Sequence, residues 1–146
     1  MSRQKIKGVK KRKFQRLDLP LQVTLTVVPD EVIPGGVRPL EFTSRNVSLQ
    51  GICLETSQIV FDSVNILSGR PGARENRLEM AIELVAGDSP VFVSGEVCWY
   101  DMETCGDEFL YQVGIVFTDF AAGAQSRLKA FLKQQRKGFF SRLFAN

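Results

Sequence analysis

The amino-acid sequence predicts a mainly all-β domain, a six-stranded antiparallel β-barrel followed by one C-terminal α-helix. Apolar residues alternate with polar residues in six short runs, which is the period of half-buried strands. These runs all precede a single helical segment, without the alternation of strands and helices that parallel sheets require. Each run has one apolar stripe, and six such strands bury their stripes best when the sheet closes into a barrel.

The 146 residues fit one domain better than two. We expect a flexible basic N-terminal arm over residues 1–11, because this segment has little that can bury a core. A domain is predicted over 12–138, with the barrel at about 17–118 and the helix at about 119–137. An aromatic and basic tail is predicted over 139–146.

The first three strands are predicted from alternation and from the turns between them. Leu19–Val27 alternates apolar with polar residues and is rich in β-branched ones. Pro34-Gly35-Gly36 marks the following loop, and a second strand over Arg38–Thr43 leads into a turn at Asn46–Gly51. A third strand begins at Ile52.

The last three strands and the helix follow the same logic. Strands are predicted over 78–84, 91–99 and 109–117, with a hairpin turn at Gly87–Pro90 and a bulge or bend at Gly95. Beyond Asp119 the apolar period becomes helical, and Gly138 is predicted to stop the helix. The helix is expected to bury one apolar face, formed by Ala124, Leu128, Phe131 and Leu132.

Composition argues against several function classes. The chain has no histidine, and Cys53, Cys98 and Cys105 lack CxxC spacing, so a metal site or a histidine-dependent hydrolase is not expected. We predict a non-enzymatic protein without a cofactor. No apolar run approaches the ~20 residues of a membrane span, and the basic start lacks an apolar segment behind it. The expected location is therefore cytoplasmic, with reduced thiols.

Charge is strongly partitioned along the chain. Residues 1–16 carry eight Lys/Arg and no acid, and residues 121–146 carry six Lys/Arg and no acid. Residues 17–120 hold five basic and all sixteen acidic residues. The basic ends can bind a polyanion or lie against the acidic body.

Two short motifs are the strongest functional signal. Arg12 and Arg16 are separated by three residues, and Asn46, Ser48 and Gly51 form a second pattern about thirty residues later. Alone, the first is typical of a solvated basic segment and the second of a plain β-turn. Together, in this order and ahead of strand-like runs, they resemble the RxxxR and (D/N)xSxxG motifs of the PilZ domain. The resemblance covers roughly residues 12–135 and implies binding of cyclic di-GMP.

The ligand's chemistry suits these residues. A guanidinium can grip guanine or phosphate with two parallel hydrogen bonds and can stack on a purine, so Arg12 and Arg16 are better candidates than the neighbouring lysines. The resemblance implies that Asn46 and Ser48 contact ligand while Gly51 holds the turn. Lys11 precedes the first arginine, a position that in the family influences whether one or two ligand molecules bind. Arg45 either adds a phosphate contact or faces solvent.

The leading hypothesis is a receptor in which cyclic di-GMP orders the N-terminal arm and changes a surface read by an unidentified protein effector. Alternatives are a small β-barrel that binds nucleic acid, and a PilZ-like adaptor that acts by protein contact without ligand. Nucleic acid is not expected, because the acidic body repels a long polyanion and the aromatic residues lie mainly at core positions. Trp99 is expected in the core or at the barrel rim, rather than as a stacking platform. The segment Phe139–Phe144 can dock on a partner, on a membrane surface or back on the barrel, and the oligomeric state is left open.

Overall fold

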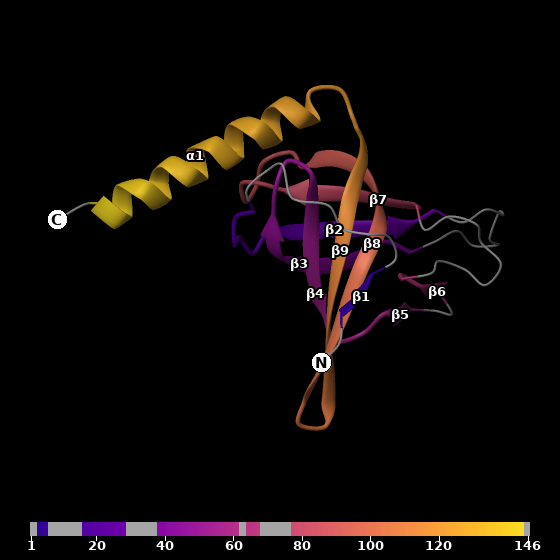
Figure 1. Cartoon of the computed structure of the whole chain (residues 1–146). Helices are drawn as coiled ribbons and strands as arrows, with labels where there is room; N and C mark the ends of the chain where they lie inside the picture. Colours follow the sequence, from indigo (N-terminus) through magenta and orange to yellow (C-terminus); the bar gives the residue numbers. More distant parts are fainter. Residues whose placement is uncertain (1–2, 6–15, 29–37, 62–63, 68–76, 145–146) are drawn as a thin grey trace.

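The computed structural model describes residues 3–5, 16–28, 38–61, 64–67 and 77–144. Figure 1 shows a barrel of strands from which one helix projects. Six strands form the barrel, and all of their pairings are antiparallel. They are β2 (Gln22–Val27), β3 (Leu40–Val47), β4 (Gly51–Thr56), β7 (Arg77–Glu83), β8 (Val91–Cys105) and β9 (Glu108–Phe120).

The sheet closes on itself. The strand order is β8-β7-β2-β3-β4-β9, and the additional pairing of β8 with β9 completes the circle. A separate two-stranded sheet joins β5 (Val60–Phe61) to β6 (Val64–Asn65). The six-stranded barrel with a C-terminal helix confirms the predicted fold class.

Alternation places one stripe of each strand inside the barrel. In β2 the side chains of Val23, Leu25 and Val27 are buried, and the polar residues between them face outward. The side chains buried in the same way on β4 and β9 include those of Leu54, Val113 and Ile115. Burial of these side chains, at about 1.5–3 kcal/mol each, is the main force that closes the barrel.

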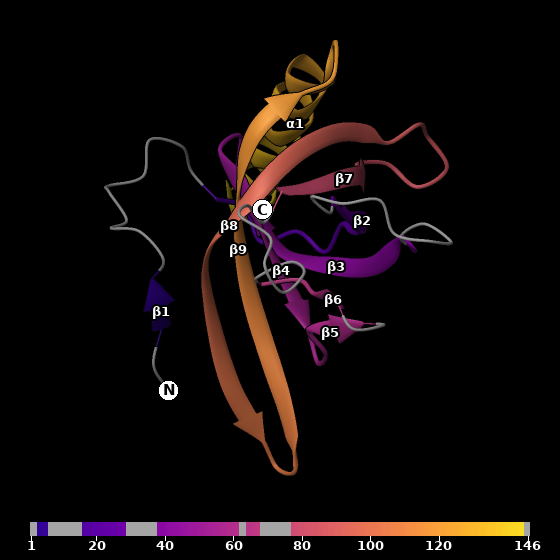
Figure 2. The same cartoon turned by 90° about the vertical axis from the view of Figure 1, so that its right-hand side faces the viewer.

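The hairpin of β8 and β9 is longer than the sequence predicted. The two strands pair from Val93↔Phe120 to Cys105↔Glu108, and their far end extends beyond the rest of the barrel (Figure 2). The sequence prediction stopped near residue 99, because charged residues interrupt the apolar alternation from there on. The bend expected at Gly95 is confirmed as a register shift between Ser94 and Gly95.

The helix α1 spans Ala124–Phe144, so both predicted ends were wrong. It starts later than 119 because β9 stays paired with β8 as far as Phe120. Gly123, with φ +80°, turns the chain, and its carbonyl accepts a hydrogen bond from the Arg127 N–H at 3.1 Å. The helix continues past Gly138 because a single glycine costs a helix only about 1 kcal/mol. Residues 139–144 are therefore part of the helix and not a separate tail.

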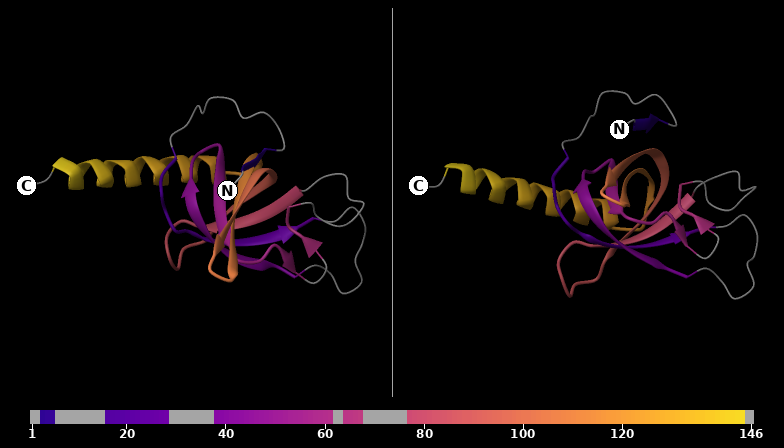
Figure 3. Two further views of the ribbon diagram at one scale, coloured as in Figure 1. Left: turned by 60° about the horizontal axis from the view of Figure 1, so that its bottom comes forward. Right: turned by 90° about the horizontal axis from the view of Figure 1, so that it is seen from below.

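Only the first turns of α1 pack on the barrel. Ala124, Leu128 and Leu132 are buried and Phe131 is partly buried, which confirms the predicted apolar face. The later turns leave the barrel and point away from it (Figure 3). Within the part of the chain that the structure describes, no helix combines the length and apolar character that a membrane span needs.

The N-terminal segment contains one short strand. Residues 1–11 were predicted to be a flexible arm, whereas β1 (Arg3–Lys5) pairs with β8 at Trp99–Asp101. Backbone pairing, which the apolar pattern does not reveal, accounts for this difference. Residues 6–11 lie outside the described part of the chain.

Candidate functional site

The second motif forms the turn between β3 and β4. Asn46 is in the last part of β3, Ser48 is in the turn and Gly51 begins β4. The Ser48 N–H donates to the Gly51 carbonyl at 2.9 Å. The Ser48 Oγ accepts hydrogen bonds from the N–H groups of Gln50 at 3.1 Å and of Gly51 at 3.3 Å. These contacts fix the oxygen, and the hydroxyl can still donate its hydrogen to a ligand.

The chain after the first motif runs directly beside this turn. Leu17 and Val47 exchange two backbone hydrogen bonds, of 2.8 and 2.9 Å, in an isolated antiparallel bridge. In antiparallel register the residue before Leu17 lies across from the residue after Val47. The half-buried Arg16 is therefore opposite Ser48. Arg12 and Lys11 lie outside the described residues.

A buried serine that belongs to neither motif secures this arrangement. Ser44 is 4% exposed, and its hydroxyl accepts from the Leu21 N–H at 2.8 Å and donates to the Leu19 carbonyl. The Ser44 N–H also donates to the Leu21 carbonyl at 2.9 Å. Ser44 thus ties the segment that follows Arg16 to β3.

Gly51 is required for a reason other than an unusual backbone conformation. Its φ is not positive, since the positive-φ glycines among the described residues are Gly87, Gly106 and Gly123. A Cβ at Gly51 would lie 2.4 Å from the Ile115 carbonyl oxygen of β9, a distance that real side chains do not adopt. The close approach of β9 to β4 therefore excludes larger residues.

Arg45 lies at a bulge in β3, between Ser44 and Asn46. The bulge leaves Asn46 only 8% exposed, whereas the Arg45 side chain is 51% exposed. Its guanidinium is 3.6 Å from the Glu55 carboxylate. A phosphate contact from Arg45 would have to compete with this weak surface pair.

The strand register brings Trp99 onto the same outer face as Asn46. Asn46 pairs with Cys53, Cys53 pairs with Gly114, and Gly114 pairs with Trp99. The neighbours of Gly114 on β9 are fully buried core residues, so Gly114 faces outward. A Cβ at Gly114 would lie 2.1 Å from the Trp99 Nε1, which means that the indole lies over this glycine.

Trp99 is therefore not a core residue, so the first of its two expected places is wrong, and sequence reasoning missed its contact with Gly114. The signal was present in the sequence as a glycine and a tryptophan on neighbouring strands, where the indole can occupy the space of the missing side chain. Beside it, burial raises the pKa of the Cys98 thiol, which keeps this thiol neutral near pH 7.

One outer row across β3, β4, β9 and β8 thus holds the amide of Asn46 and the indole of Trp99, and the Ser48 hydroxyl and the backbone of Arg16 lie at its β3–β4 end. The guanidinium supplies charge and forked donors, the amide and hydroxyl supply hydrogen bonds, and the indole offers a flat apolar surface. This set suits a planar, anionic ligand with several hydrogen-bonding groups. No group of three or more His, Cys, Asp and Glu suited to a metal ion occurs among the residues that the structure describes.

Solved structures with a similar fold come from several bacteria. The K. pneumonia MrkH–c-di-GMP complex is 17% identical, with a TM-score of 0.66 over 92% of this chain and 56% of that chain. The PilZ domain of YcgR from Escherichia coli, with c-di-GMP, is 9% identical, with a TM-score of 0.61 over 93% of this chain and all (100%) of that chain. The Bacillus subtilis inhibitor of motility MotI/DgrA is 18% identical, with a TM-score of 0.57 over 90% of this chain and 54% of that chain.

These TM-scores show a shared fold. The chain spans about half the length of the MrkH and MotI chains, at 56% and 54%. A search of curated protein sequences gives no significant match. A family model described as the PilZ domain matches residues 10–134, which include both motifs, the barrel and the first half of α1. The chain belongs to the PilZ domain family.

Proposed function

We propose that this protein is a non-enzymatic receptor for cyclic di-GMP, which binds on the outer face of the barrel at the β3–β4 turn. One observation carries the proposal. The Leu17–Val47 bridge sets Arg16, from the first motif, opposite Ser48, from the second. The match to the PilZ family and the c-di-GMP complexes of proteins with this fold support the same ligand.

Each residue has a distinct role in this proposal. Arg16, together with Arg12, grips phosphate or guanine through forked hydrogen bonds. Asn46 pairs with a purine edge, and Ser48 donates its hydroxyl hydrogen. Trp99 forms a wall on which a guanine can rest, and Gly51 allows β9 to approach β4.

The proposed signal is a change in the basic N-terminal arm. A dianion bound between Arg16 and the β3–β4 turn offsets repulsion among the lysines and arginines of residues 1–16. The segment around residues 10–17 then becomes ordered against the barrel, whereas β1 already pairs with β8 without ligand, and a protein effector reads the changed surface. We expect hydrogen exchange to slow around residues 10–17 and 45–52 on ligand binding, with little change in the other barrel strands. Unchanged exchange in the arm at saturating ligand would contradict this relay.

Calorimetric titration with cyclic di-GMP tests the ligand directly, and fluorescence of Trp99 gives a second readout because the chain has one tryptophan. Arg16→Lys keeps the charge but loses the fork, so we expect its affinity to fall at least about tenfold, or ~1.4 kcal/mol. Arg77→Lys, on β7, is the matched control and should bind as the parent does. Equal binding by Arg16→Lys would refute the forked contact. Preference for single-stranded DNA over cyclic di-GMP would favour the nucleic-acid alternative.

A further inference from the structure

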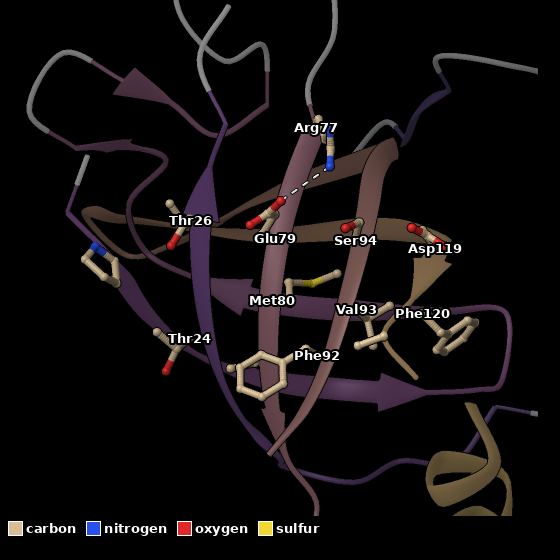
Figure 4. Close-up of a pocket in the computed structure, with 13 residues that line it drawn as sticks. Thr24, Thr26, Arg77, Glu79, Met80, Phe92, Val93, Ser94, Asp119 and Phe120 are labelled. Atoms are coloured by element: carbon tan, nitrogen blue, oxygen red, sulfur yellow. Dashed lines mark hydrogen bonds and ion pairs between the residues drawn. The ribbon is translucent and has the colours of Figure 1, made fainter. Parts of the chain in front are cut away.

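The outer face of β2, β7 and β8 carries a groove that continues onto the end of β9 at Asp119 and Phe120 and shares no lining residue with the β3–β4 turn. Its volume is about 540 Å³ (Figure 4). Phe92 stands at this face with 57% of its surface exposed. Small residues surround the ring, and the strand register places Thr24, Ala81 and Phe92 in one cross-strand row. A large side chain from outside can therefore enter the hollow and contact Phe92.

Acidic residues border this groove. A second cross-strand row contains Thr26, Glu79, Ser94 and Asp119. Glu79 is 3.4 Å from Arg77, and both side chains are more than half exposed, at 55% and 53%. Glu41 extends the acidic border, since it accepts a hydrogen bond from the Thr24 hydroxyl at 2.9 Å. The groove thus fits an apolar anchor that is flanked by cations.

The projecting half of α1 has this chemistry. The helix contains six Lys/Arg and no acid. Spacing of three and four residues places five positions on one helix face, different from the face of Leu128 and Leu132 that packs on the barrel. These positions are occupied by Lys133, Arg136, Lys137, Phe140 and Phe144.

We propose that the projecting half of α1 from one copy docks in the groove of a second copy. The segment from 133 to 144 is ~18 Å long, and three strands span ~10 Å, so the helix can cross the whole groove. The projecting half of α1 cannot reach the groove of its own copy. Leu128 and Leu132 hold the helix base, the Arg127 guanidinium donates to the Ser89 carbonyl at 2.7 Å, and the helix axis leads away from the barrel (Figure 1).

Two copies that exchange helices reciprocally make a closed dimer, whereas one-way docking makes longer assemblies. Both rest on the same helix–groove contact and on opposite charges, so association should weaken as salt rises. No residue that lines the groove belongs to the candidate ligand site at the β3–β4 turn, so this association does not depend on the proposed ligand.

Sedimentation velocity of the ligand-free full chain over a concentration series tests the contact. We expect the parent to self-associate, and Phe92→Asp or Phe140→Asp to weaken association at least about tenfold. Phe109→Asp is the matched control, since Phe109 is a similarly exposed aromatic residue (49%) on the hairpin of β8 and β9. Circular dichroism should show that all three variants keep the parent fold. A parent that is monomeric throughout, or association lost only in Phe109→Asp, would overturn the proposal.

Mixing the two variants separates helix–groove docking from helix–helix docking. Phe92→Asp keeps an intact helix, and Phe140→Asp keeps an intact groove, so their mixture retains one complete contact and should associate more strongly than either variant alone. Helix–helix association predicts no such recovery. Recovery that is absent, or a parent that binds only to vesicles containing anionic lipid without forming assemblies, would refute docking on a second copy.

Discussion

Ser44 holds the segment after Arg16 against β3, although it belongs to no motif. It makes hydrogen bonds to both Leu19 and Leu21 while almost fully buried. We expect Ser44→Ala to lower the free energy of unfolding by about 1–3 kcal/mol, because the Leu19 and Leu21 backbone groups lose a buried partner. Affinity for cyclic di-GMP should fall as well, since Arg16 is positioned through this segment. Urea unfolding and calorimetric titration measure the two effects.

Thr43→Ala is the control for this variant. Thr43 is the neighbouring residue and is exposed, and its hydroxyl accepts a hydrogen bond from the exposed Gln22 side chain at 3.5 Å. Its free energy of unfolding and its affinity should stay close to those of the parent. If Ser44→Ala behaves in the same way, the serine does not hold the segment.

Asn46 and Gly51 belong to one motif, but substitutions at these two positions should have different effects on ligand affinity and on melting temperature. Asn46→Ala is expected to lower ligand affinity without lowering the melting temperature, because its proposed partner is the ligand. Gly51→Ala is expected to lower both, because the new Cβ meets the Ile115 carbonyl oxygen at 2.4 Å and β9 must move. Thermal melts with and without cyclic di-GMP separate the two. Equal loss of melting temperature would indicate a purely structural turn.

At the residue scale, the sequence predicted which residues form the candidate site better than it predicted which residues surround them. Asn46, Ser48 and Gly51 were selected because the two motifs together resemble the PilZ pattern, and they lie at or beside the β3–β4 turn. The reason for Gly51 and the place of Trp99 depend on which residues face each other across strands. Bulges in β3 and β8 shift that register, and the sequence marked the one at Gly95 but not those at Arg45 and Cys98.

At the scale of elements, all six barrel strands were predicted from alternation, because each has one buried stripe. The far end of the β8–β9 hairpin was not predicted, since a strand outside the barrel has no core to impose alternation. The helix end was missed for a related reason. The last turns of α1 leave the barrel, so neither burial nor a stop signal marks where they finish.

Gly138 gives a test of this helix end. It is exposed, a Cβ there would meet nothing within 4 Å, and it lies inside the helix. Gly138→Ala should therefore stabilise the projecting turns by up to about 1 kcal/mol and raise helicity, as measured by circular dichroism at 222 nm. Ala130→Gly, at an exposed position of the same helix, should lower helicity. A fall in helicity for Gly138→Ala would support the original expectation of a glycine stop.

At the scale of the whole molecule, the residues that stabilise the fold and the residues proposed to bind ligand lie on opposite faces of the barrel wall. Along β4, Leu54 is fully buried in the core, while its neighbour Cys53 pairs with Asn46 in the outer row that leads to Trp99. A one-residue step thus changes a side chain from the core to the candidate site. Core substitutions should consequently change stability and leave ligand recognition intact.

Leu54→Ala tests this separation. Removing this side chain from the core should lower the free energy of unfolding by about 2–5 kcal/mol, and the melting temperature should fall with it. A ligand at one hundred times its dissociation constant adds about 2.7 kcal/mol of stability, which raises the melting temperature by roughly 5–10 °C for a domain of this size. We expect Leu54→Ala to keep a rise of similar size with cyclic di-GMP, because the outer face is unchanged. Asn46→Ala should melt like the parent without ligand and lose most of the rise. If Leu54→Ala loses the rise while Asn46→Ala keeps it, the ligand does not bind at the β3–β4 turn.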